Sequence, residues 1–198
     1  MEDSDKLPKD QLYLLARLGE MLLEWNTAED WLQGLLLNKM GRSDKMQVLT
    51  THMSNVAVTD ALRTLAADFS TPEMAPHLTH AAELFDRLRE YRNFYAHASI
   101  VQWPDTKGAR IYLHQATARG RFSLSQTFVR GQEIEELIEQ CMALSRYASA
   151  ITGWYPMRGD PDYSQSLSSL EKPPLPDRLQ KPRLFPQAPK PPPHSSQA

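Results

Sequence analysis

Several features that would point to a particular class of protein are scarce in this 198-residue chain. It has one cysteine, Cys141, so an internal disulfide is excluded and a reducing compartment is expected. The formal net charge of −2 does not suggest a general nucleic-acid binder, so any RNA contact must come from a local basic patch. The acidic N-terminus does not resemble a signal peptide, and no apolar run approaches membrane-spanning length. We therefore expect a cytoplasmic protein that does not contact the membrane.

Apolar residues make up 41% of the chain, which is enough for one helical domain with a sizeable core and a tail. Apolar side chains recur with the helical period along most of residues 8–154. The pattern predicts helices over about residues 8–40, 44–53, 58–69, 76–98 and 133–154. Gly41 stands where a glycine commonly ends a helix. These segments predict a mainly α-helical domain over residues 1–154.

Two other segments depart from this period. Residues 109–115 and 121–129 alternate between apolar and polar side chains, with Arg119-Gly120 between them, and so predict a β-hairpin before the last helix. From Pro156 onward the chain holds 11 of its 15 prolines and few large apolar residues. A segment of that composition cannot bury enough apolar surface to form its own core. Residues 155–198 are therefore predicted to be a disordered, proline-rich tail.

The most convincing chemical group is Arg92, Asn93 and His97, near the end of the helix predicted over residues 76–98. An apolar stripe at spacings of four, three and four residues directs this helix towards a core: Leu84, Leu88, Tyr91 and Tyr95. The three polar residues lie beside that stripe. An arginine offers a permanently charged fork suited to phosphate, and a histidine titrates near neutrality. Together they could hold and cleave a phosphodiester.

Residues 92–97, Arg-Asn-Phe-Tyr-Ala-His, resemble the Arg-x4-His motif of the HEPN superfamily, small helical proteins that are often metal-independent ribonucleases and toxins. Residues 25–32 resemble the first-helix signature of that family, in which an acidic residue, here Glu29, faces the motif helix. The order of helices, motif, hairpin and final helix is similar to several prokaryotic members and covers about residues 8–154. The resemblance implies an antiparallel bundle of four to five helices.

The resemblance also implies a metal-independent endoribonuclease that needs no cofactor and acts as a homodimer, with the motif helices facing. His97 would serve as acid or base while the 2′-hydroxyl attacks the phosphorus, and Arg92 would stabilise the developing charge. Asn93 would orient His97 or donate to phosphate, and Glu29 would fix Arg92. A toxin or phage-defence effector accompanied by an antitoxin protein is the implied role. Ala98-Ser99 follow His97, so the tyrosine found there in HEPN toxins inactivated by nucleotide addition is absent.

RNA-binding residues are expected around the hairpin, the only strongly basic part of the domain. Phe94 and Trp103 are the candidates for stacking on bases, and the basic candidates are Lys107, Arg110, Arg119 and Arg121. Charges that protect the edge of a solvated hairpin are an equally weighted interpretation of the same basic residues.

Structural interpretations stand beside the catalytic one. Arg92 could pair with Glu29 or Glu90, and His97 could interact favourably with the helix C-terminus. His77 and His80 share a helical turn, but no further ligands are at hand and a metal site is not predicted. The main alternative function is a non-catalytic module of the same fold for dimerisation and for RNA or protein binding.

Overall fold

A computed structural model describes residues 9–97, 99–102, 111–118, 122–128, 131–154, 167 and 169–179, with side chains described from Leu12 onward and outside the strands. The elements are α1 (Lys9–Met40), α2 (Asp44–Thr51), α3 (Asn55–Asp68), α4 (Ala75–His97), β1 (Ser99–Gln102), β2 (Ile111–Ala118), β3 (Phe122–Phe128) and α5 (Gly131–Trp154). The expectation of a mainly helical protein is confirmed, and the predicted helix limits agree to within about three residues.

Local signals account for where the helices begin and end. Gly41 adopts a φ of +92°, a conformation that other residues rarely adopt, directly after the last residue of α1. Ser43 and Ser54 precede α2 and α3, and the hydroxyl of each accepts a hydrogen bond of 3.3 Å from the main-chain N–H three residues later. The chain therefore turns sharply after α1 and restarts with two capped helices.

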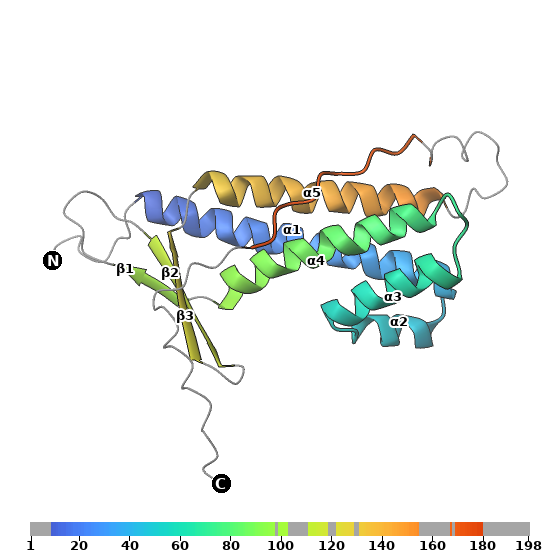
Figure 1. Cartoon of the computed structure of the whole chain (residues 1–198), viewed down its shortest axis with the longest axis horizontal. Helices are drawn as coiled ribbons and strands as arrows, with labels where there is room; N and C mark the ends of the chain where they lie inside the picture. Colours follow the sequence, from blue (N-terminus) through green and yellow to red (C-terminus); the bar gives the residue numbers. More distant parts are fainter. Residues whose placement is uncertain are drawn as a thin grey trace, which may run out of the picture.

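The three long helices α1, α4 and α5 lie side by side, and α2 and α3 lie at one end of them (Figure 1). Trp25 of α1 stacks on Phe85 of α4 with ring centroids 4.4 Å apart and an interplanar angle of 9°, and both side chains are fully buried. Following the colours of Figure 1, α1 and α5 run in the same direction and α4 runs in the opposite one. The expectation of a fully antiparallel bundle is therefore wrong for α1 and α5.

The insert between α4 and α5 is a three-stranded antiparallel sheet in the order β1-β2-β3. In β2 and β3, Tyr112 pairs with Phe128 and Ala118 with Phe122. The first strand, β1, pairs Ser99 with His114. The sheet has one strand more than the predicted hairpin, because residues 99–102 after α4 are extended and pair with the free edge of β2.

The chain after α5 returns to the bundle. Residues 169–179, which we call the proline-leucine segment, run in extended conformation over α4 and α5 (Figure 1). Leu170, Leu175 and Leu179 pack against the core, as does Leu167, which is only 2% exposed. The prediction of disorder from residue 155 onward is therefore wrong for this segment. Its leucines cannot form a core of their own, but they extend one that the helices already provide.

Hydrogen bonds attach the proline-leucine segment to α4. The main-chain oxygens of Pro173 and Pro176 bond to His80 and Arg87 at 2.7 and 2.8 Å. Proline lacks a main-chain N–H but keeps its carbonyl, so a proline-rich strand can still accept from a helix surface in this way. None of the described helices is long and apolar enough to cross a membrane.

Candidate functional site

Arg92 and Asn93 lie near the end of α4, and both side chains are partly buried. The guanidinium of Arg92 donates a hydrogen bond of 3.2 Å from Nη1 to Oδ1 of Asn93. The Nε of Arg92 is buried and has no hydrogen-bond partner in the part of the chain that the structure describes. Asn93 thus contacts Arg92, and one donor group of the guanidinium stays buried and unpaired within the described chain.

Glu29 of α1 lies near enough to Arg92 of α4 for their charges to interact. Burial raises the pKa of Glu29, and the nearby indole of Trp25 and positive charge of Arg92 partly oppose that rise. The net effect disfavours the charged form of Glu29, and Glu29 and Arg92 do not form a direct ion pair among the described side chains. Glu90, the other acid considered for Arg92, instead pairs with Arg178 at 2.8 Å.

His97 is the last residue of α4, and its side chain is exposed. Residues five apart on an α-helix are separated by about 140° around its axis, so α4 directs Arg92 and His97 to different faces. Asn93 and His97 are separated by only about 40° and share a face. The helix by itself therefore does not place the arginine and the histidine on one face.

The remaining candidates for RNA binding have different outcomes. Phe94 is 1% exposed and meets Tyr95 edge-on, with ring centroids 5.4 Å apart, so the prediction that it stacks on bases is wrong. Its position on α4 turns it into the protein, because it lies next to the apolar stripe. The other five candidates lie outside the residues whose side chains are described: Trp103, Lys107, Arg110, Arg119 and Arg121.

The histidines of α4 that could have held a metal make protein contacts. Nδ1 of His77 lies 2.7 Å from the hydroxyl of Tyr147, and Nε2 of His80 lies 2.7 Å from the carbonyl oxygen of Pro173. Within the described chain, no group of three or more histidine, cysteine, aspartate or glutamate side chains could hold a metal ion. The two histidines thus join α4 to α5 and to the proline-leucine segment.

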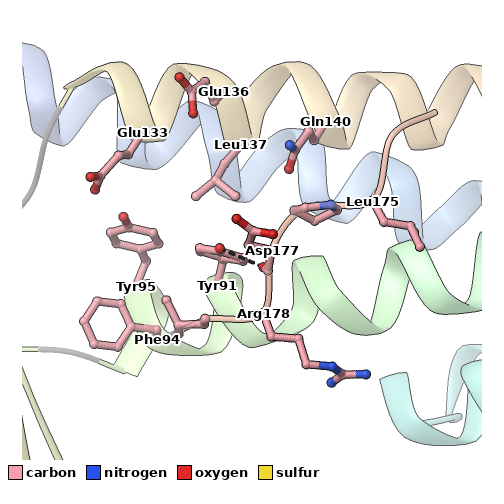
Figure 2. Close-up of a pocket in the computed structure, with 12 residues that line it drawn as sticks. Tyr91, Phe94, Tyr95, Glu133, Glu136, Leu137, Gln140, Leu175, Asp177 and Arg178 are labelled. Carbon is pink, nitrogen blue, oxygen red and sulfur yellow. Dashed lines mark hydrogen bonds between the residues drawn. The ribbon is translucent and has the colours of Figure 1, made fainter. Parts of the chain in front are cut away.

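A cavity of about 690 Å³ lies between α4, α5 and the proline-leucine segment (Figure 2). Its lining residues are Tyr91, Phe94, Tyr95, Glu133, Glu136, Leu137, Gln140, Leu175, Pro176, Asp177, Arg178 and Leu179. The predicted catalytic residues Arg92, Asn93 and His97 do not line it. Sequence reasoning missed this cavity because one wall comes from a segment expected to be disordered. The leucines at 170, 175 and 179 were the signal in the sequence that could have indicated that this segment packs on the domain.

The comparisons with known proteins add no relative. No protein-family model matches the chain, and no curated protein and no solved structure matches it.

Proposed function

We propose that the protein is a metal-independent endoribonuclease of the HEPN type that acts as a homodimer. The observation that carries the proposal is the setting of Arg92: a half-buried guanidinium, oriented by Asn93 and near Glu29, whose buried Nε has no partner in the described chain. A guanidinium held in this way is suited to binding a phosphate, because its fork is preorganised and its charge is only partly balanced.

The geometry of α4 supports a dimer. Arg92 and His97 lie about 140° apart around the helix axis, so one chain presents the two side chains on different faces of α4. Two α4 helices that face each other across a two-fold axis would place Arg92 of one protomer opposite His97 of its partner. The second copy also supplies a second histidine, which general acid–base catalysis of this reaction requires.

In the proposed reaction, one His97 removes the proton of the 2′-hydroxyl, and the oxygen attacks the neighbouring phosphorus. The bond to the 5′-oxygen breaks, and the other His97 protonates that leaving oxygen. Arg92 binds the phosphoryl oxygens as negative charge grows on them. The products are a 2′,3′-cyclic phosphate and a 5′-hydroxyl. Asn93 acts through Arg92, to which it is hydrogen-bonded.

Cleavage of a mixed RNA pool in excess EDTA tests the proposal. His97→Ala should lower the rate by about 10²- to 10⁴-fold while sparing the fold and most RNA affinity, because it removes a proton-transfer group. Arg92→Ala should reduce both binding and cleavage. His52→Ala, a change at an exposed histidine after α2, is the matched control and should leave the rate unchanged. A substrate with a 2′-deoxyribose at the cut site should be inert.

Equal cleavage by wild type and His97→Ala, or activity that follows added metal, would contradict the catalytic role. Light scattering tests the dimer. A molar mass of the monomer at micromolar concentration, with and without RNA, would exclude a cleft shared by two chains.

A non-catalytic HEPN-like module for dimerisation and for RNA or protein binding is the second candidate. It is favoured by the contacts that already surround Arg92, since Asn93 and Glu29 could serve only to stabilise the fold. RNA binding without cleavage by the wild-type protein would support this candidate. A role as a toxin or phage-defence effector in the cytoplasm, with an antitoxin protein as partner, is proposed only together with the nuclease activity.

A further inference from the structure

The cavity between α4, α5 and the proline-leucine segment combines aromatic walls with carboxylates. In Figure 2 the rings of Tyr91 and Tyr95 point from α4 towards α5, where Glu133 and Leu137 lie opposite them. The volume of about 690 Å³ falls within the range typical of sites for small organic molecules. The cavity thus has the size of a ligand site, and aromatic and acidic side chains line it.

The charges around the cavity favour a positive ligand. Among the described residues that line it, Glu133, Glu136 and Asp177 are acidic and Arg178 alone is basic. The guanidinium of Arg178 bonds to Glu90 at 2.8 Å and approaches Glu83 at 3.4 Å, and in Figure 2 it points away from the cavity. The guanidinium of Arg178 is therefore directed outside, and the other charged side chains of the described lining are carboxylates.

The tyrosines remain neutral and present their π faces. Burial raises the pKa of Tyr95 to about 12, with a further contribution from the charge of Glu133. Burial likewise raises the pKa of Tyr91, and Asp177 adds to the effect. Neutral aromatic rings close to carboxylates attract cations both through the ring quadrupole and through the nearby negative charge.

One polar atom at the cavity has no hydrogen-bond partner in the described part of the chain. The side-chain oxygen of Gln140 is buried and accepts no hydrogen bond from the residues that the structure describes. An unsatisfied buried acceptor is costly, and it is satisfied when a ligand brings an N–H group. Gln140 is therefore the independent sign that a donor-bearing molecule belongs here.

The walls of the site are held in place before any ligand arrives. The hydroxyl of Tyr91 donates a hydrogen bond of 2.9 Å to the main-chain oxygen of Asp177, and the main-chain N–H of Leu179 donates to Glu90 at 3.2 Å. These bonds fix the proline-leucine segment across the end of the cavity. A preorganised site loses less entropy on binding than one that must first form.

We propose that this cavity binds a small organic cation, with an ammonium, amidinium or guanidinium group on a flat apolar body. The N–H groups donate to Gln140 and to the carboxylates of Glu133 and Glu136, and the apolar body packs against Tyr95 and Leu137. The site shares none of its lining residues with the Arg92, Asn93 and His97 group, so the inference does not depend on the proposed nuclease function.

Benzamidine and benzamide are the probes, because the two molecules have nearly the same shape and only benzamidine is charged at neutral pH. Titration of the full chain, followed by calorimetry and NMR, should give an affinity for benzamidine on the order of tenfold higher than for benzamide. Glu133→Gln and Gln140→Leu should each weaken benzamidine binding several-fold. Glu139→Gln, an exposed change on the same helix outside the cavity, is the matched control and should leave binding unchanged.

Circular dichroism establishes that each variant keeps the helical fold, and Glu136→Gln serves as a second charge variant should Glu133→Gln fail to fold. Equal affinities for the two probes would overturn the proposal. So would no detectable benzamidine binding at millimolar concentration, or binding that Glu133→Gln and Gln140→Leu leave unchanged.

Discussion

The phenolic hydroxyl of Tyr91 donates a hydrogen bond of 2.9 Å to the main-chain oxygen of Asp177, 86 positions further along the chain. Tyr91 directly precedes Arg92 on α4, and Asp177 lies in the proline-leucine segment. One bond therefore joins the helix of the proposed catalytic group to the segment that walls the cavity. Substitutions that detach the proline-leucine segment should therefore also alter the structure at the end of α4.

Removal of the proline-leucine segment should destabilise the protein. Truncation after Ser168 deletes Leu170, Leu175 and Leu179, which pack on the core, and the bonds to His80 and Arg87. A segment that is docked in most molecules is stabilised by at least about 1 kcal/mol, which corresponds to about 2–4 °C in melting temperature for a chain of this size. Calorimetry of the two chains measures the difference.

Truncation after Leu179 keeps the segment and is the control for loss of the remaining residues. Within the segment, Leu175→Ala should cost more than Arg178→Ala, because the exposed ion pair of Arg178 with Glu90 contributes only about 0–1 kcal/mol. An unchanged melting temperature after the shorter truncation would mean that the segment does not contribute to stability in solution.

His77 should make the stability depend on pH. Burial, with smaller effects of Lys172 and His80, lowers the pKa of His77 below its usual value of 6.5. The folded protein thus prefers neutral His77, and the unfolded chain binds its proton more readily. The contribution to stability is present above pH 6.5 and is lost as the pH falls through the lowered pKa. Chemical unfolding at several pH values should show a smaller decline below pH 6.5 in His77→Gln than in wild type.

His52→Gln provides the matched control for this titration, since it removes one histidine from an exposed position. That variant should decline with falling pH as the wild type does. If His77→Gln and wild type lose stability in parallel between about pH 7 and pH 5, the buried imidazole is not the group responsible.

Cys141 should be unreactive in the folded protein. Its side chain is 2% exposed, and burial raises the pKa of the thiol to about 12. Because the thiolate is the reacting species, Ellman's reagent at pH 8 should label the protein only on the timescale of unfolding. Arg146→Cys in a Cys141→Ala background places an exposed thiol on the same helix and should react at once. Rapid labelling of native wild type would show that α5 opens locally.

Much of the helical architecture is predictable from the sequence. Apolar residues recur with the helical period, Gly41 and the two serine caps mark the ends of helices, and these signals act over a few residues. The buried stripe of α4 was predicted through Leu84 and Leu88 for the same reason. The candidate group of Arg92, Asn93 and His97 was also visible as a spacing, although the spacing alone does not say which partners these residues have.

The tertiary structure decided the features that depend on distant segments. The leucines at 170, 175 and 179 are too few to form a core, and only the helices assembled beside them give those side chains a place to be buried. The same holds for Phe94, which the packing of α4 buries although its position beside Arg92 suggested a base stacker. Composition limits what a segment can bury by itself, whereas burial against existing helices depends on where the chain returns in space.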